Sequence, residues 1–479
     1  MDDILVGGLP AGQMYLLEGT PGTGKTTIAL QFIRHGIVAG EPSLYVTLSE
    51  SKRELEASAR SHGWSFDEFS IAEFMPEEAS LSPEQQYTVF HPSEVELAST
   101  VQKLTDLIEK IKPKRLVIDS LSELRLLAAD TMRYRRQLLA LKQFFAGRDT
   151  TVLLLDDRSA EGSDMQLQSI AHGLIRLCKV PRSYGVNRRQ IEIVKMRGTP
   201  FREGFHDYTI KTGGLEIYPR LVANEHFGNF ENERVASGIT ALDQMFGGGI
   251  SRGSSTLLMG PTGSGKSTMS IQYAAAAAQR GDRAIVYSFD EVLRTAIDRA
   301  ESLQIPVRKL LEGGQLRMLQ VDPAELSPGE LVAQIRKDVE ERDTRVVVID
   351  SINGFLAAMP GEQDLILQLH ELVAYLNQKG VITFLILTQH GLVGMMATDI
   401  DVSYLADTVV LLRYFEAESE IRQVISVLKQ RVGRHERTLR EFHLDNTGIT
   451  VGEPLKHFRG ILTGVPDVLS KVESSTSEG

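Results

Sequence analysis

The chain has 479 residues, of which 42% are hydrophobic and 24% are charged, a composition typical of soluble globular proteins. This length exceeds one ordinary domain, so we expect two or three. The formal net charge of −11 argues against nucleic acid or an anionic membrane as the main partner, because bulk electrostatics would repel both.

Several features indicate a cytoplasmic protein. The single cysteine, Cys178, cannot form an internal disulfide. The N-terminal stretch MDDILVGGLP lacks the basic start and apolar run of a signal peptide. The apolar runs TVLLL and VITFLIL are far shorter than the ~20 residues that span a bilayer. The Ser/Glu-rich tail, residues 469–479, is expected to be disordered.

Two glycine-rich loops, GTPGTGKTT (19–27) and GPTGSGKST (260–268), fit the pattern G-x-x-x-x-G-K-[ST]. Such a loop points successive backbone N–H groups at phosphates, its lysine bridges the β- and γ-phosphates, and its hydroxyl binds Mg²⁺. The runs MYLLEG and STLLMG read as strands before the loops, and helical patterns follow them. We therefore predict ATP contacts from Gly19, Thr20, Pro21, Gly22, Thr23, Gly24, Lys25, Thr26, Thr27, Gly260, Pro261, Thr262, Gly263, Ser264, Gly265, Lys266, Ser267 and Thr268.

The loops belong to an internal repeat. Lys25 and Lys266 lie 241 positions apart, and the strand patterns RLVIDS and RVVVIDS end in aspartates 231 positions apart. The motifs EIVKMRGTPFREGF (192–205) and SVLKQRVGRHERTLREF (426–442) follow, with Lys195 and Lys429 lying 234 positions apart. These three signals, in one order at nearly constant offset, predict tandem copies of one α/β domain, each a mostly parallel sheet flanked by helices. We place the domains at residues 1–224 and 225–468, with the boundary near EHFGNFENERVASG.

The first copy is expected to have a shortened N-terminal segment. At the 241-residue offset Met1 falls opposite Leu242, so RVASGITA (234–241) of the second copy has no counterpart. Either the first domain lacks this leading segment or the true start codon lies upstream.

Four carboxylates complete the predicted chemistry. Asp119 and Asp350, at the ends of the VID strands, are candidate Mg²⁺ partners, together with Thr26 and Ser267. Glu50 and Glu291 also align at an offset of 241 and are candidate bases that orient and deprotonate water. Asp290 aligns with Ser49, so the two sites differ chemically. The alternative for either glutamate is a solvated loop acid.

Two basic pairs lie near the end of each copy: Lys195 with Arg197, and Lys429 with Arg431. Each pair is a candidate to reach the γ-phosphate of a neighbouring subunit as basic fingers. An exposed strand pair without catalytic role is the alternative reading.

Together these motifs resemble the KaiC family of tandem RecA-like ATPases. The resemblance covers nearly the whole chain and includes GGLPAG, SGITALD, GGGISRG, KMRGTPF and DTVVLLRY besides both P-loops. It implies two-tiered homohexamers with ATP and Mg²⁺ bound between protomers, slow hydrolysis in the first domain, and basic fingers acting on the neighbouring subunit. It also implies a signalling or timing role with clock-type protein partners.

The resemblance further implies Ser/Thr autophosphorylation in the second domain. Ser403 occupies the family's phosphoserine position, and Thr398 is a second candidate acceptor. Tyr404 replaces the family's phosphothreonine, which puts an ordered two-site cycle in doubt. The paired glutamates of the clock protein fall on Ser49–Glu50 and Asp290–Glu291, so each pair here has lost its first glutamate. The resemblance then implies that Glu50 acts alone in the first domain, and that Asp290, one methylene shorter than its counterpart, is a candidate catalytic residue beside Glu291 in the second.

Two other functions fit the same motifs. One is a DNA-dependent RecA or helicase-type ATPase, because this class shares the fold and a fold does not fix function. The acidic balance of the chain and the lack of an appended DNA-binding module argue against it. The other is a nucleotide-sensing scaffold with negligible hydrolysis.

Overall fold

The computed structural model describes residues 1–65, 69–74, 92–128, 130–157, 165–182, 184–357, 362–391, 401–417, 419–463 and 467–468. The chain divides into two units, Met1–Arg220 and Leu221–Gly479. Leu221 and Ala223 pack in the core of the second unit, where the Ala223 N–H donates to Glu371 at 2.8 Å. In the described part of the chain, no helix is long and apolar enough to cross a membrane.

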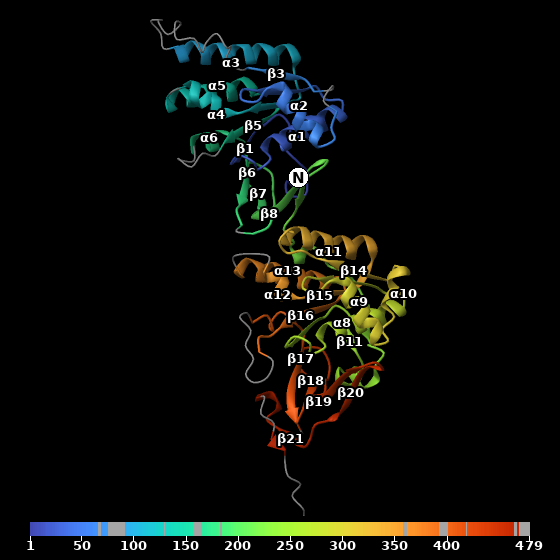
Figure 1. Ribbon diagram of the computed structural model, residues 1–479. Coiled ribbons are helices and arrows are strands. Elements are labelled where there is room, and N and C mark those ends of the chain that lie inside the picture. The colour runs from blue at the N-terminus through green and yellow to red at the C-terminus, as the bar shows by residue number, and fades with distance from the viewer. Residues whose placement is uncertain are drawn as a thin grey trace, which may run out of the picture. The chain divides into compact units, whose positions relative to one another are not determined.

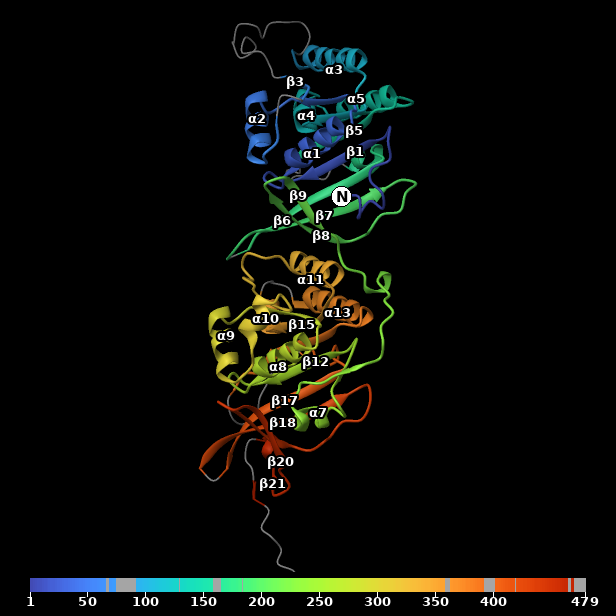
Figure 2. The same cartoon turned by 90° about the vertical axis from the view of Figure 1, so that its right-hand side faces the viewer.

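Each unit contains one nine-stranded sheet with the same strand order (Figures 1 and 2). The first sheet runs β3-β2-β4-β5-β1-β6-β7-β8-β9 and the second runs β14-β13-β15-β16-β12-β17-β18-β19-β20. In both, the strands up to the sixth position pair in parallel and the last three join as antiparallel neighbours. The predicted tandem RecA-like fold is therefore confirmed.

The elements of the first unit are β1 (Met14–Gly19), α1 (Lys25–Val38), β2 (Ser43–Thr47), α2 (Lys52–Ser61), β3 (Ile71–Glu73), α3 (Pro92–Ile111), β4 (Arg115–Asp119), α4 (Leu121–Ala128), α5 (Thr131–Phe145), β5 (Thr151–Asp157), α6 (Met165–Ile170), β6 (Gly173–Val180), β7 (Arg188–Met196), β8 (Phe205–Lys211) and β9 (Gly214–Tyr218).

The elements of the second unit are β10 (Arg234–Val235), α7 (Thr240–Met245), β11 (Ile250–Ser251), β12 (Ser255–Gly260), α8 (Lys266–Gln279), β13 (Arg283–Ser288), α9 (Leu293–Ser302), α10 (Val307–Glu312), β14 (Leu316–Gln320), α11 (Pro328–Arg342), β15 (Thr344–Asp350), α12 (Ile352–Ala357), α13 (Glu362–Gln378), β16 (Ile382–Thr388), β17 (Thr408–Ala417), β18 (Glu420–Gln430), β19 (Arg440–Asp445), β20 (Gly448–Pro454), β21 (Phe458–Arg459) and β22 (Asp467–Val468).

The central strands are apolar on both faces because helices cover both faces of each sheet. Along β1, Tyr15 and Leu17 pack with α1 and α2, whereas Met14 and Leu16 pack with α3, α4 and α5. This alternation is the two-residue period of a strand. The second unit repeats the arrangement, with α7 to α10 on one face and α11 to α13 on the other.

The parallel strands place their carboxyl ends at one edge of each sheet, where ligands bind in open α/β sheets. In the first unit Gly19 lies opposite Asp157 and Thr47 lies opposite Asp119. In the second unit Gly260 lies opposite Thr388 and Ser288 lies opposite Asp350. The P-loop and the strand-end carboxylates therefore share one edge in each domain.

Candidate active sites

In the first P-loop, the lysine side chain is hydrogen-bonded to carbonyl groups of the loop itself. Gly24 is left-handed (φ 91°) and α1 begins at the next residue with no side-chain cap. Lys25 Nζ donates to the carbonyls of Gly19 at 2.8 Å and Thr20 at 3.3 Å, and Thr23 Oγ1 donates to Thr20 O at 2.7 Å. An uncapped helix N-terminus with a lysine at its start is a ready binding site for phosphate.

The second P-loop repeats this geometry. Gly265 is left-handed (φ 93°) and α8 begins at Lys266, again without a side-chain cap. Lys266 Nζ donates to Gly260 O at 2.9 Å and to Pro261 O at 2.7 Å, and Ser264 Oγ also donates to Pro261 O. Burial lowers the pKa of Lys266 to about 8, which favours an anionic ligand that keeps the ammonium charged.

The glycines before the two lysines cannot be replaced without strain. A Cβ on Gly24 would lie 2.7 Å from Ile210, and one on Gly265 would lie 2.7 Å from Phe442. Both residues also have a positive φ, which a side chain disfavours. The tips of the loops, including Gly22 and Gly263, are exposed. The loops therefore fit the polyphosphate that the sequence predicts.

The two P-loop lysines differ in one contact. Lys25 Nζ forms an ion pair with Asp157 Oδ1 at 2.6 Å. Asp157 is opposite Gly19 in the first sheet, and the residue opposite Gly260 in the second sheet is Thr388. Within the described ranges, Lys266 has no ion pair. Nucleotide must therefore displace a carboxylate from the lysine in the first domain only.

The predicted magnesium residues come together in both domains. Tyr45 Oη donates to Asp119 Oδ2 at 2.5 Å and also interacts with Thr26. In the second domain Ser267 hydrogen-bonds Asp350 directly. Burial raises the pKa of both aspartates, and a neighbouring carboxylate raises it further. A buried carboxylate beside a hydroxyl suits Mg²⁺ held jointly with nucleotide oxygens.

No cluster of three or more His, Cys, Asp or Glu side chains able to hold a metal occurs within the described ranges. Mg²⁺ usually binds through one or two carboxylates plus substrate phosphates and water, not through a dedicated protein cage. The residues that would hold it are those that the sequence singles out: Thr26 with Asp119, and Ser267 with Asp350.

Glu50 lies close enough to Asp119 and Lys25 of the first site for their charges to act on its carboxyl group. Its backbone is anchored by Thr47, whose Oγ1 donates to Glu50 O at 2.6 Å and accepts from Glu50 N at 3.0 Å. Glu50 Oε2 is buried and has no hydrogen-bond partner among the residues that the structure describes. Burial, followed by the charges of Asp119, Glu54 and Asp157, raises the pKa of Glu50, and Lys25 lowers it. A carboxylate whose pKa is raised is a stronger base than a carboxylate with the usual pKa of glutamate.

Glu291 occupies the matching place in the second domain but is paired. Ser288 Oγ donates to Glu291 O at 2.8 Å, the same anchor that Thr47 provides. Glu291 Oε1 forms an ion pair with Arg299 Nη1 at 2.6 Å. Asp290, which is exposed, accepts a hydrogen bond from Ser351 Oγ. Among the residues that the structure describes, both acids therefore have side-chain partners that Glu50 lacks.

The predicted fingers bind backbone carbonyls within their own domain. In the first domain, Lys195 Nζ donates to Gln168 O at 2.6 Å and Arg197 Nη2 donates to Ser169 O at 2.8 Å. The carbonyls belong to the segment that leads into β6. Burial, followed by the charge of Arg197, lowers the pKa of Lys195. The two side chains thus form a clamp on this segment, and Arg197 remains exposed.

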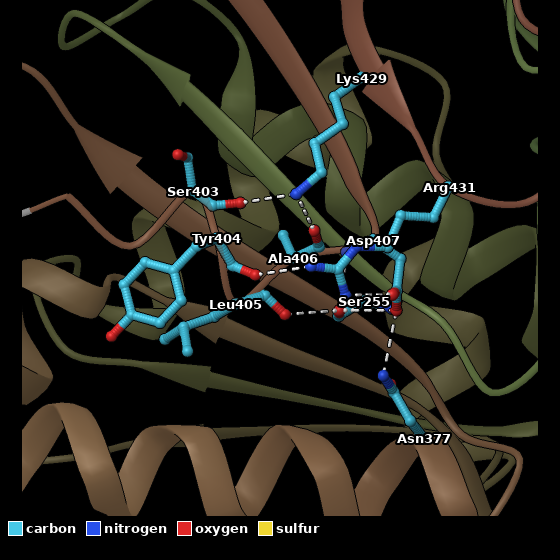
Figure 3. Close-up of polar contacts among 9 residues, drawn as sticks. All are labelled: Ser255, Asn377, Ser403, Tyr404, Leu405, Ala406, Asp407, Lys429 and Arg431. Carbon is cyan, nitrogen blue, oxygen red and sulfur yellow. Dashed lines mark hydrogen bonds and ion pairs between the residues drawn. The ribbon is translucent and has the colours of Figure 1, made fainter.

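The second domain has the same clamp, shown in Figure 3. Lys429 Nζ donates to Ser403 O at 3.1 Å and to Ala406 O at 2.8 Å. Arg431 donates to Tyr404 O at 3.0 Å and pairs with Asp407 Oδ1 at 3.2 Å. The clamp therefore holds the segment that carries Ser403, the predicted phosphorylation site, whereas Thr398 lies outside the described residues.

Asp407 ties the clamped segment to the sheet. Its Oδ2 accepts from Ser255 N, Ser255 Oγ and Asn377 Nδ2, each at 3.0 Å (Figure 3). Ser255 begins β12, the strand that leads into the second P-loop. The clamp and the nucleotide loop are therefore connected through β12.

The sequence alone did not reveal four residues that contact the predicted site residues: Asp157, Tyr45, Arg299 and Gln168. For three of these the partner is distant in sequence, so no local pattern marks it. Arg299 carried a usable signal, because the 241-residue offset places Ser58 at the corresponding position and predicts unequal surroundings for the two glutamates.

Two RecA-like domains, each with a P-loop, a strand-end aspartate and a glutamate after the second strand, define a tandem P-loop ATPase. Comparison with known proteins agrees. A protein-family profile described as "ATPase: KaiC" matches residues 1–222 and again 235–456. The chain belongs to the KaiC ATPase family, and it is an ATPase of the KaiC type that binds nucleotide.

Curated relatives are similar over almost the whole chain. The chain is 29% identical over 477 residues to the circadian clock oscillator protein KaiC of Acaryochloris marina, which covers 98% of this chain and 90% of that protein. It is 28% identical over 480 residues to the circadian clock protein KaiC3 of Synechocystis, with 99% and 94% covered. It is 27% identical over 487 residues to the oscillator protein KaiC of Synechococcus elongatus, with 99% and 92% covered.

Proposed function

We propose that this protein is a ring-forming ATPase of the KaiC type that hydrolyses ATP mainly in its first domain. The single observation that carries the proposal is the difference between the two glutamates. Glu50 has a buried, unpartnered oxygen among the described residues and a raised pKa, whereas Glu291 is held in an ion pair with Arg299. A general base needs a free oxygen aimed at the attacking water.

The chemistry follows from the first site. Backbone N–H groups of the P-loop and Lys25 hold the phosphates, and Thr26 with Asp119 would hold the Mg²⁺ that neutralises charge on them. Glu50 orients a water molecule and accepts its proton as the water oxygen bonds to the γ-phosphorus. The bond from the γ-phosphorus to the bridging oxygen breaks, and ADP leaves with that oxygen. The two products are ADP and inorganic phosphate.

The family resemblance supports a homohexamer with ATP between protomers. In that assembly Lys195 and Arg197, or Lys429 and Arg431, would stabilise charge on a neighbour's γ-phosphate. Both pairs bind carbonyls of their own chain in this structure. To reach a neighbour's nucleotide, these side chains would have to leave the carbonyls of their own chain. Ring assembly would then change the position of the segments that they hold.

The second domain is proposed to phosphorylate itself weakly on Ser403 or Thr398. Ser403 supports this because Lys429, one of the predicted fingers, donates a hydrogen bond to its carbonyl. The position of the Ser403 backbone therefore depends on what Lys429 contacts. Tyr404 is 53% exposed, but its phenol extends farther than a serine hydroxyl and would not place its oxygen in line. The similarity to circadian clock proteins supports a timing or signalling role.

The test incubates purified protein with γ-labelled ATP and follows free phosphate and protein-bound label separately. Glu50→Gln is expected to remove most phosphate release, and Glu291→Gln to remove little. Equal losses would contradict the division of labour. Label on Tyr404 in phosphopeptide mapping would contradict the proposed acceptors.

The same assay separates the two other functions. Single-stranded DNA that stimulates turnover with a steep salt dependence would favour a DNA-dependent ATPase. A nucleotide-dependent ring with turnover insensitive to Glu50→Gln would favour a scaffold. Neither result is expected, because the chain is acidic and Glu50 Oε2 has no hydrogen-bond partner in the described part of the chain.

A further inference from the structure

The two candidate bases have the same backbone support, so the difference between them lies in the side chains. Each glutamate follows the second strand of its domain, β2 or β13. Thr47 Oγ1 donates to Glu50 O at 2.6 Å, and Ser288 Oγ donates to Glu291 O at 2.8 Å. A hydroxyl-to-carbonyl bond therefore holds the loop that presents the carboxylate at both sites, and Thr47 also accepts from Glu50 N at 3.0 Å.

Arg299 distinguishes the surroundings of the Glu291 side chain from those of Glu50. It lies on α9, the helix that follows Glu291, and its Nη1 is 2.6 Å from Glu291 Oε1. The two side chains are 35% and 25% exposed, so the pair is partly shielded from water. Among the described residues, Arg299 Nε and Nη2 are buried without hydrogen-bond partners. Within that part of the chain, the guanidinium therefore directs its hydrogen bonding to Glu291.

The first domain has a serine at this place. Helices α2 and α9 correspond at an offset of 241 residues, because the buried Leu55 and Ala59 match the buried Ala296 and Ala300. The counterpart of Arg299 is then Ser58, which is partly exposed. Ser58 is too short and uncharged to hold a carboxylate in an ion pair.

We propose that Arg299 is a positioning residue that withholds Glu291 from the attacking water and keeps hydrolysis in the second domain slow. The proposal rests on the proposed function, in which these glutamates act as bases. A base must take the proton of water while the γ-phosphorus gains the water oxygen and loses the bridging oxygen. Oε1 of Glu291 accepts from the guanidinium, and this bond orients the carboxylate toward α9, so that it is not free to turn toward the attacking water.

The experiment uses the full chain carrying Glu50→Gln, so that remaining phosphate release comes from the second domain. Adding Arg299→Ser is expected to raise kcat about tenfold, with KM for ATP unchanged. A positioned base accelerates a reaction by about 10²–10⁴-fold, and we expect the substitution to recover only part of this rate. The matched control is Arg294→Ser on the same helix, because Arg294 is 89% exposed and pairs only loosely with Asp298 at 3.8 Å. This control is expected to leave kcat unchanged.

The reciprocal change tests the idea in the other domain. In a Glu291→Gln chain, Ser58→Arg is expected to lower first-domain kcat about tenfold, again with KM unchanged. Unchanged kcat in both arms would overturn the proposal. A raised KM without a gain in kcat for Arg299→Ser would also overturn it, because Arg299 would then bind nucleotide.

A different result would contradict the proposed function itself. In that case Glu50→Gln alone would leave phosphate release unchanged. Thermal unfolding of each variant with ATP bound reports whether Arg299→Ser still folds. If it does not, the Ser58→Arg arm alone decides the outcome.

Discussion

Replacing Asp157 by threonine is expected to tighten ATP binding in the first domain. Lys25 Nζ lies 2.6 Å from Asp157 Oδ1, and the lysine must leave this carboxylate to reach the phosphates. Threonine is the residue that the second domain has at the same register position, Thr388. The substitution therefore gives the first site the polar surroundings of the second.

The magnitude follows from the exposure of the pair. The side chain of Asp157 is 43% exposed and that of Lys25 is 10% exposed. Fully exposed ion pairs contribute about 0.2–1 kcal/mol, and hydrogen bonds to charged groups about 1.5–3 kcal/mol. Solvent screening favours the lower values, so we expect about 1 kcal/mol, or about a fivefold lower Kd. Loss of a negative charge beside the triphosphate acts in the same direction.

The assay titrates the full chain with a fluorescent ATP analogue and Mg²⁺ in a Lys266→Ala background, which leaves only the first site. The reverse change, Thr388→Asp in a Lys25→Ala background, is the matched control and should weaken binding by a similar factor. The difference should shrink as salt is added, because exposed charges are screened. Unchanged or weaker binding by Asp157→Thr would refute the reasoning, since Asp157 would then support the bound nucleotide.

Four further outcomes are expected. Because the pKa of Glu50 is raised, first-domain turnover should fall on the acid side at a higher pH than an ordinary glutamate imposes, and a pH–rate profile measures this. Nucleotide-free wild type should also gain stability relative to Glu50→Gln as pH falls through that pKa, which thermal unfolding across pH would detect. Gly24→Ala should abolish first-site binding, because its Cβ would lie 2.7 Å from Ile210 in a left-handed backbone; normal titration would contradict this. Second-site affinity in a Lys25→Ala chain should decline above about pH 8, where free Lys266 loses its proton; a flat profile would contradict it.

The sequence by itself determined the fold class, the duplication and the positions of the P-loop, strand-end aspartate and glutamate in each copy. These features are local: a strand, a glycine loop and a helix occupy one short stretch, and Gly24 and Gly265 are recognisable because a left-handed backbone requires them. The offset that aligns the lysines also aligns Glu50 with Glu291. Repetition therefore assigns the two carboxylates to equivalent positions in the two domains.

Only the tertiary structure decided which partner each of these groups has. Lys25 meets Asp157 because the sheet order places β5 beside β1, although the two residues are far apart in the chain. Lys195 meets the carbonyl of Gln168 because β7 folds back along β6. A motif fixes the type of group at a position, whereas its charge environment depends on strand order and on the helices packed beside it. The unequal surroundings of two nearly identical loops are therefore a property of the folded domains.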